Sequence, residues 1–166
     1  MKIVIVNGRG GVGKDEFCHI CNELTGLKCM TYSTITRIKY VARQLGWDDT
    51  KDEKGRKFLS DLKAISNVYS DFLFQCACDD IGATDSIKGI DVVFVMCREP
   101  EEIDKFKKKF NAFTVLIKSK RTEKQVYGNK SDDKVNDYVY DYYIHNDGTL
   151  EDLRDWAKWF LKEIGV

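Results

Sequence analysis

Segment 2–17 constrains the fold of this chain more than any other part of the sequence. It reads KIVIVNGRGGVGKDEF, and its β-branched apolar residues lead directly into the spacing G-x-x-x-x-G-K. Gly8, Gly13 and Lys14 occupy the fixed positions of that spacing. A buried strand that runs into a glycine-rich turn and then a helix is the arrangement that binds nucleoside triphosphate phosphates. The segment therefore predicts a strand, a phosphate-binding loop and a helix, in that order.

The residue types of the loop suit an anionic ligand. Glycine allows a positive φ, so that successive backbone N–H groups can point at one anion. The helix that follows adds its free N–H groups and the positive end of its dipole. Lys14 can reach the β- and γ-phosphates as a point charge. We therefore predict that ATP binds at Gly8, Arg9, Gly10, Gly11, Val12, Gly13, Lys14 and Asp15.

Asp15 stands where the usual motif has a Ser or Thr whose hydroxyl binds Mg²⁺. A carboxylate is also a hard oxygen ligand, so Asp15 could hold Mg²⁺ directly or through water. Alternatively, Asp15 only stabilises the first turn of the helix, and waters and phosphates hold the metal. Arg98 and Glu99 directly follow the strand over 91–97, whereas Asp91 stands at its beginning. Glu99 is thus a second carboxylate that could serve the metal.

Composition narrows the class of protein. A chain of 166 residues suits one domain with a sizeable core. Lys plus Arg and Asp plus Glu both number 27, so no net field indicates a nucleic-acid polymer as a partner. No apolar run reaches membrane-spanning length and we recognise no signal peptide, so we expect a soluble, cytoplasmic protein without a membrane partner. The six cysteines are then reduced thiols, and Cys18 and Cys21 share one helix face and pack.

Strand-like and helical patterns alternate along the chain. The strand-like runs are 2–7, 28–32, 91–97, 113–118 and 140–145. The helical patterns are 13–24, 33–45, 52–81, 100–110 and 149–164. Such alternation predicts a parallel sheet that is covered on both faces. We expect a three-layer α/β/α domain over 1–166 with a five-stranded, mainly parallel sheet.

Segment 119–137 is polar and dense in charge, and it lies between two core strands that a short connection could join. Long ordered loops of this kind often act as lids, so we predict a lid over about 119–137, with a plain surface loop as the alternative. Residues 129–132 read Asn-Lys-Ser-Asp and fit the base-reading pattern of GTPases. Because they do not follow a strand, we interpret this match as coincidental.

The arginines Arg37, Arg56, Arg98 and Arg121 are the candidates for stabilising a migrating phosphoryl group. Arg98 directly follows an apolar strand, and ligands of open α/β sheets bind outside the carboxyl ends of strands. Arg121 begins the predicted lid and could close over the γ-phosphate. Each of these arginines could instead form a structural ion pair or a solvated surface charge.

Two segments are candidates for the acceptor. Ser33 can cap the helix that follows the second strand, and Thr34 and Arg37 could bind a monophosphate. Within 55–63, Arg56 lies on the polar face of a helix and Asp61 lies at its edge, where it could receive a base or a sugar hydroxyl. A solvated helix face is the alternative for most of these charges.

With these motifs the chain resembles the P-loop nucleoside monophosphate kinases over most of its length. It looks closest to the deoxynucleoside monophosphate kinases of phages and some bacteria, and more distantly similar to the phosphomevalonate kinases of animals. Those groups have a loop that ends in Gly-Lys-Asp, as Gly13-Lys14-Asp15 does. Segments 33–37, 56–63 and 98–100 also resemble the group. Segment 141–151 resembles the closing strand, turn and helix of small-molecule kinases, which implies that Asn146 and Gly148 lie near adenine.

The resemblance implies ATP- and Mg²⁺-dependent phosphoryl transfer to a nucleoside monophosphate, with an acceptor-binding helical insertion at about 33–86. The catalytic residues would be Lys14, Arg98 and Arg121, the acceptor residues would be Ser33, Thr34, Arg37, Arg56 and Asp61, and Asp15 would serve the metal. The partners would be small-molecule nucleotides, and a homodimer is left open. One alternative is a kinase for a non-nucleotide phosphate ester such as phosphomevalonate. Another is a regulatory module that binds a nucleotide without transferring phosphate.

Overall fold

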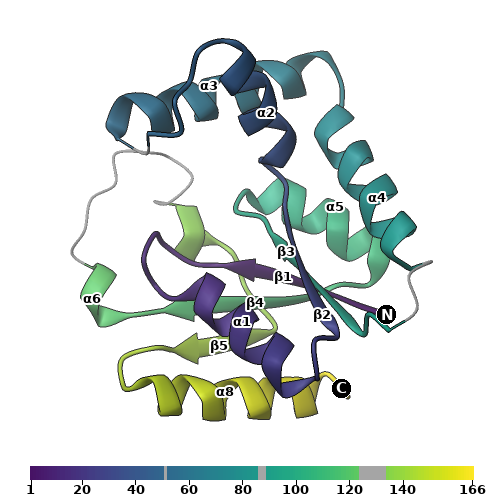
Figure 1. Cartoon of the computed structure of the whole chain (residues 1–166), viewed down its shortest axis with the longest axis vertical. Helices are drawn as coiled ribbons and strands as arrows, with labels where there is room; N and C mark the ends of the chain where they lie inside the picture. Colours follow the sequence, from purple (N-terminus) through teal and green to yellow (C-terminus); the bar gives the residue numbers. More distant parts are fainter. Residues whose placement is uncertain (51, 86–88, 124–133) are drawn as a thin grey trace.

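A computed structural model of the chain describes residues 1–50, 52–85, 89–123 and 134–166 (Figure 1). Its centre is one sheet of five strands in the order β2-β3-β1-β4-β5. All neighbouring strands are parallel. The strands are β1 (Lys2–Asn7), β2 (Cys29–Ser33), β3 (Val92–Met96), β4 (Phe113–Lys118) and β5 (Tyr142–His145).

The central strands are apolar because helices cover both of their faces. Strands β3 and β4 flank β1, and Val4 of β1 pairs with Phe94 of β3 and with Phe113 of β4. Val4, Ile5 and Phe94 are fully buried. Continuous apolar runs are what a parallel sheet with two covered faces requires.

Helices α1 (Lys14–Leu24) and α8 (Leu150–Glu163) cover one face of the sheet. Phe17 of α1 and Phe160 of α8 meet edge to face there, with ring centroids 5.6 Å apart. The other face is covered by α4 (Phe72–Asp85) and α5 (Pro100–Phe110). The result is three layers, helices on sheet on helices (Figure 1).

Two helices lie beyond the sheet. Helices α2 (Thr36–Gln44) and α3 (Glu53–Tyr69) pack on each other above the ends of β2 and β3, at the top of Figure 1. The short helix α6 (Lys120–Glu123) follows β4, and the 3₁₀ helix η1 (Lys134–Asp137) precedes β5. Residues 124–133 of the predicted lid, including the Asn-Lys-Ser-Asp segment, lie outside the described residues.

The predicted three-layer fold is confirmed, and its strands agree with the predicted runs to within two residues at either end. The single helix predicted over 52–81 is wrong. It is two helices, because Ser70 is extended (φ −164°, ψ 165°) and α4 begins anew after Asp71, whose carbonyl accepts the N–H of Gln75. Apolar periodicity runs across this break without a change, so the pattern could not locate it.

The predicted cap at Ser33 is also wrong. Ser33 is the last residue of β2, and α2 begins after Ile35 without a side-chain cap. The strand continues because the Thr34 hydroxyl donates to the Met96 carbonyl (3.3 Å) and holds the chain against β3.

In the described segments, no helix is long and apolar enough to cross a membrane. All six cysteines fall within those segments as free thiols. Cys18 and Cys21 are both buried in the layer between α1 and the sheet, as predicted.

Candidate active site

The predicted site residues that follow a strand lie at one edge of the sheet, because parallel strands all end on the same side. The glycine loop follows β1, Thr34 follows β2 and Arg98 lies just beyond β3. Ser119 follows β4 and Asn146 follows β5. Ligands of open parallel sheets bind at this edge.

The glycine loop has the backbone conformation that its sequence predicts. Gly8, Gly11 and Gly13 all have positive φ, at 146°, 75° and 93°. Gly13 is the residue from which α1 starts. The Lys14 ammonium lies across the loop, with Nζ 2.6 Å from the Gly8 carbonyl and 2.7 Å from the Arg9 carbonyl. A cation and the amino end of an eleven-residue helix therefore meet at this loop.

Asn7 joins three parts of the site. Its side chain is fully buried, and its Oδ1 accepts the N–H of Gly8 (2.7 Å). Its Nδ2 donates to the Arg98 carbonyl (3.2 Å) and to the Tyr140 hydroxyl (2.7 Å). Burial raises the pKa of Tyr140, whose hydroxyl stays protonated and donates to the Val135 carbonyl (3.0 Å). Asn7 thus fixes the loop, the Arg98 turn and the end of the predicted lid relative to one another.

Asn146 supports the glycine loop from β5. Its side chain is buried, and its Nδ2 donates to the Val12 carbonyl (2.9 Å). Its own carbonyl accepts from Arg121 Nη2 (3.2 Å), and Arg121 Nε donates to the Ser119 hydroxyl (3.2 Å). Arg121 is exposed at the start of α6 and ties the ends of β4 and β5 together beside the loop. An adenine contact of Asn146 stays a prediction, because this amide group is engaged by the loop.

Gly148 has a structural role in the described contacts. A Cβ at this position would collide with the Asp152 carboxylate. Asp152 closes the capping box of α8, in which the Thr149 hydroxyl accepts the Asp152 N–H and the Asp152 carboxylate accepts the Thr149 N–H. Thr149 is thus the N-cap residue of α8.

The acceptor candidates at the end of β2 have partners on α4. Arg37 is exposed, with Nη2 3.3 Å from Oδ1 of Asp80. Oδ2 of Asp80 also accepts from the Tyr32 hydroxyl (3.1 Å). An exposed ion pair of this kind is weak, so a phosphate dianion could replace Asp80 as the partner of Arg37.

The two site residues predicted on α3, Arg56 and Asp61, are both exposed, whereas Lys63 of the same helix is not. Asp61 pairs with Lys57 (2.6 Å) on the exposed side, and the described contacts do not bring it to the glycine loop. Arg56 is also exposed. Lys63 is different from both, since its ammonium lies between Glu99 (2.6 Å) and Glu102 (2.7 Å) at the start of α5. Arg56 and Asp61 therefore lie on an exposed helix face, the alternative expected for these charges, and Lys63 does not.

The carboxylates differ in their availability to a metal ion. Asp15 is exposed in the first turn of α1, beside Lys14. Glu99 follows β3 but is paired with Lys63. A hard oxygen donor next to a phosphate-binding loop fits Mg²⁺, which keeps most of its coordination for water and phosphate. The arrangement therefore favours Asp15 over Glu99 as the protein carboxylate for the metal.

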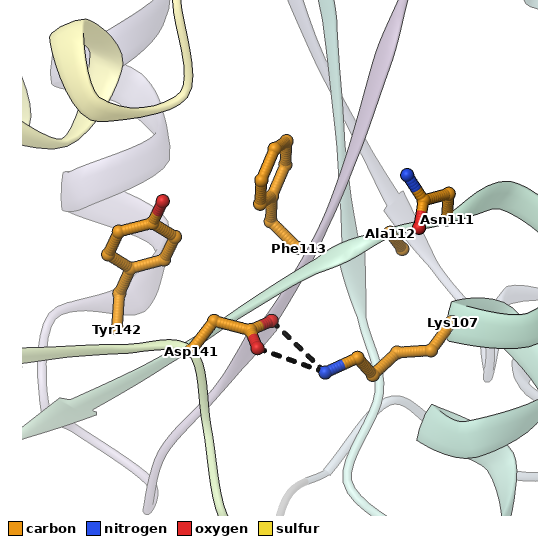
Figure 2. A pocket seen from close by; sticks show the side chains of 6 residues that line it. All are labelled: Lys107, Asn111, Ala112, Phe113, Asp141 and Tyr142. Carbon is orange, nitrogen blue, oxygen red and sulfur yellow. Dashed lines mark hydrogen bonds and ion pairs between the residues drawn. The ribbon is translucent and has the colours of Figure 1, made fainter.

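A shallow pocket lies at the amino ends of the strands, on the side of the sheet opposite the glycine loop (Figure 2). It is lined by Lys107, Asn111, Ala112, Phe113, Asp141 and Tyr142. β4 and β5 begin there, so the pocket is on the side away from the glycine loop. Asp141 is held by the N–H and hydroxyl of Thr114 (both 2.8 Å) and by Lys107 (3.0 Å). These bonds join the beginnings of β4 and β5, so we assign Asp141 a structural role in holding the two strands together.

Asp141→Asn should lower stability by about 1 kcal/mol at neutral pH, because the carboxylate accepts charge-assisted hydrogen bonds at a partly exposed site. Burial would raise the pKa of Asp141, but the bonds from Thr114 and Lys107 outweigh it and lower the pKa below its ordinary value. The contribution is therefore complete above the unfolded pKa of about 3.9 and is lost as the pH falls through the folded pKa. Urea unfolding from pH 7 to about pH 3 should show that the stabilities of the wild type and Asp141→Asn converge in acid.

Asp155→Asn is the control. Asp155 forms an exposed pair with Lys158, so the stability of this variant should differ little from that of the wild type at any pH. A difference between the Asp141 proteins that is independent of pH would contradict this account.

Sequence reasoning missed Asn7, Tyr140 and Lys63. A polar residue at the end of an otherwise apolar strand is a signal that could have found Asn7. No local signal marks Tyr140 or Lys63, because their partners are distant in the sequence.

Comparison with known proteins places the chain among P-loop kinase folds. No family model matches the sequence. The chain is 26% identical, over 186 aligned positions, to a UPF0200 protein of Sulfurisphaera tokodaii, and the match covers 99% of this chain and 98% of that protein.

Two solved kinases have a similar fold over nearly their whole length. A sugar kinase from Janibacter sp. HTCC2649 has a TM-score of 0.56 at 13% identity, covering 98% of this chain and 95% of that one. Shikimate kinase from Aquifex aeolicus has a TM-score of 0.53 at 12% identity, covering 99% of both chains. At these identities the likeness shows that the chain has a P-loop kinase fold.

Proposed function

We propose that this chain is an ATP-dependent kinase that phosphorylates a nucleoside monophosphate, with deoxynucleoside monophosphates as the favoured acceptors. One observation carries the proposal. The Lys14 ammonium lies within the glycine loop, and Asn7 joins that loop directly to the turn that bears Arg98. A phosphate donor site and an arginine are thereby held at one edge of the sheet. The resemblance of Gly13-Lys14-Asp15 to the deoxynucleoside monophosphate kinases supports the choice of acceptor.

The proposed reaction is a direct transfer between phosphates. An oxygen of the acceptor monophosphate attacks the γ-phosphorus of ATP, the bond to the β–γ bridging oxygen breaks, and ADP leaves. The products are ADP and a nucleoside diphosphate. A phosphate monoester is already anionic, so the step needs no general base from the protein. Catalysis then consists of alignment and of stabilising the charge shared by the γ-phosphoryl oxygens.

Each residue of the edge takes a role that suits its position. The loop N–H groups and Lys14 would bind the β- and γ-phosphates. Arg98 and Arg37 would hold the acceptor phosphate, and Arg121 would close over the transferred group. Asp15 would hold Mg²⁺, which neutralises phosphate charge when bound.

The proposal is tested by ADP release from ATP and Mg²⁺ with a panel of acceptors. The panel contains the ribo- and deoxynucleoside monophosphates, phosphomevalonate, and a reaction without acceptor. We expect turnover with one or a few deoxynucleoside monophosphates. Turnover with phosphomevalonate alone would replace the nucleotide acceptor with a different phosphate ester. Binding of ATP without turnover of any acceptor would instead support a regulatory module.

Arg98→Ala should raise the KM of the acceptor by about 10- to 100-fold, because it removes a charge-assisted contact with the acceptor phosphate. The KM of ATP should change far less. Steady-state kinetics with each substrate varied in turn measure both values. Arg154→Ala is a matched control, since Arg154 pairs with Glu23 (3.0 Å) where α8 meets α1. An equal rise in both KM values for Arg98→Ala would contradict an acceptor role.

A further inference from the structure

Lys63 occupies an unusual position for a lysine on an outlying helix. Its side chain is only 12% exposed, whereas Ile65 and Val68 of the same helix are 67% and 85% exposed. Phe58, Leu59 and Leu62 of α3 are half-buried, as expected for the apolar face of a helix. The burial of Lys63 beside them therefore needs a reason other than apolar packing.

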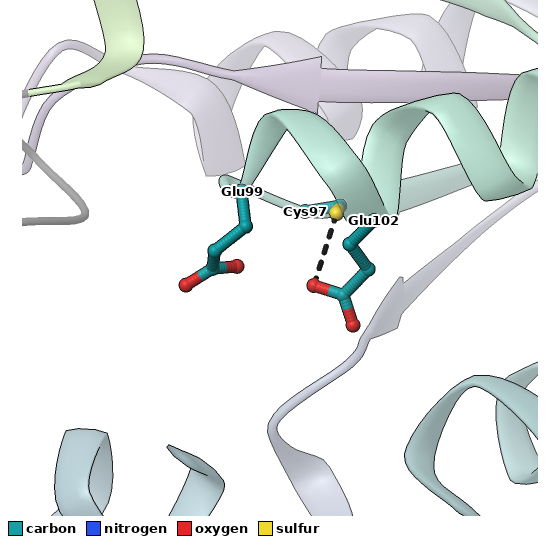
Figure 3. Close-up of side chains that lie close together, drawn as sticks. All are labelled: Cys97, Glu99 and Glu102. Carbon is teal, nitrogen blue, oxygen red and sulfur yellow. Dashed lines mark hydrogen bonds between the residues drawn. The ribbon is translucent and has the colours of Figure 1, made fainter. Parts of the chain in front are cut away.

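The reason is a cluster of charges at the start of α5 (Figure 3). Glu99 and Glu102 project from this turn to the same side, and the Lys63 ammonium lies 2.6 and 2.7 Å from their carboxylates. The Cys97 thiol donates to the same Glu102 oxygen (3.2 Å). Burial would lower the pKa of Lys63, but the two carboxylates raise it above its ordinary value, so the ammonium keeps its proton. The Lys63 ammonium is thus a cation shared by both carboxylates of this acidic cluster.

The cluster lies next to Arg98 in the sequence and in space. Glu99 is the residue from which α5 starts, yet its side chain makes no cap for that helix and reaches Lys63 instead. Its carbonyl accepts the N–H groups of Glu102 and Ile103 (both 3.0 Å). On the other side, the Arg98 carbonyl accepts from Asn7. The turn is therefore held by Asn7 from the end of β1 and by Lys63 from α3.

We propose that Lys63 is a positioning residue for the phosphoryl acceptor, which docks α3 on the Arg98 turn and thereby fixes the acceptor side of the site. This inference rests on the proposed function. Lys63 itself contacts neither substrate. It acts by setting where α3 and the Arg98 turn lie relative to the glycine loop. An interaction that aligns the acceptor affects the acceptor more than the ATP that the loop binds.

The test compares Lys63→Met with the wild-type chain in two measurements. Methionine keeps an unbranched stem and removes the charge. In steady-state kinetics the KM of the acceptor should rise about tenfold or more while the KM of ATP stays within about twofold, because the alignment of one substrate is lost. Hydrogen exchange without acceptor should become faster in α3 and in the Arg98–Glu102 turn, and stay unchanged in the glycine loop.

Two further variants sharpen the result. Lys63→Met combined with Glu102→Gln should raise the acceptor KM no further than the larger single change does, because both remove one contact. Lys105→Met is the control, since Lys105 also joins α5 to the α3–α4 junction, through Asp71 (2.5 Å), but in an exposed pair. Its kinetics should match the wild type. Should Lys63→Met not fold, Glu99→Gln makes the same test at a carboxylate that is 35% exposed.

The outcomes separate this inference from the function on which it rests. An unchanged acceptor KM in an active Lys63→Met protein would overturn the positioning role and leave the kinase intact. An equal rise in both KM values would assign Lys63 to general stability. If the wild-type chain phosphorylates no acceptor, the proposed function fails and the positioning role fails with it. The exchange measurement still reports in that case whether Lys63 docks α3.

Discussion

Lys14→Ala should lower the turnover of the proposed kinase reaction by about 10²- to 10³-fold. The ammonium is held in place by the Gly8 and Arg9 carbonyls before any ligand binds, so little reorganisation is needed when ATP enters. Its loss removes a fixed positive charge from the oxygens that share charge in the transition state. The rate of ADP release at saturating ATP and acceptor measures the effect.

The matched control for this change is Lys28→Ala. Lys28 pairs with Asp91 (3.5 Å) where β2 and β3 begin, at the edge of the sheet away from the glycine loop. The turnover of Lys28→Ala should equal that of the wild type. Circular dichroism should show that both variants are folded. Turnover that survives in folded Lys14→Ala would remove the glycine loop from the reaction.

Gly13→Ala should destabilise the chain by about 2–4 kcal/mol and weaken ATP binding by about tenfold or more. Gly13 has a φ of 93°, which strains any residue with a Cβ. In addition, that Cβ would collide with Nδ2 of Asn146. The collision would separate Asn146 from the Val12 carbonyl and shift the loop. Urea unfolding and titration with ATP measure the two effects.

Gly46→Ala separates the backbone strain from the collision. Gly46 has nearly the same φ, 91°, but a Cβ there would meet no atom within 4 Å. It should cost only the strain, about 1–2 kcal/mol, and leave ATP binding unchanged. If Gly13→Ala and Gly46→Ala lost equal stability and both still bound ATP, the role of Asn146 in supporting the glycine loop would be contradicted.

The glycine loop and the strands could be predicted because their signals are local. The glycine spacing predicts the loop without reference to any distant residue. Continuous apolar runs such as VVFVM and FTVLI are typical of parallel strands that are buried on both faces. The order of strands along the chain then brings Thr34, Arg98 and Asn146 to one edge. That edge follows from parallel pairing, so the general location of the site could be read from the sequence.

Elements that depend on tertiary contacts could not be predicted in this way. Thr34 bonds to β3 and prolongs the extended chain, so Ser33 does not become a helix cap. Ser70 breaks a helix that apolar periodicity would have continued into α4. At Ser33 the capping propensity was overridden by the bond from Thr34 to the neighbouring strand, and at Ser70 the extended backbone ends α3 within a continuous apolar pattern.

The contacts inside the site were the least predictable part. Asn146 bonds to Val12 across 134 positions, and Asn7 bonds to Tyr140 across 133. Lys63 reaches Glu102 across 39 positions from a helix that lies outside the sheet. Such pairs have no spacing rule, since only the folded arrangement brings them together. The sequence could therefore indicate which residues gather at the candidate site better than which contacts hold them there.

The central claim is that this chain transfers phosphate from ATP to a small phosphorylated acceptor. The most direct test is to follow the label of [γ-³²P]ATP with the wild-type chain, Mg²⁺ and each deoxynucleoside monophosphate, separating the products by chromatography. We predict that the label appears in a deoxynucleoside diphosphate, in an amount equal to the ADP formed. Label found only in inorganic phosphate would contradict the account. It would also be contradicted if the protein bound ATP but the label stayed in ATP.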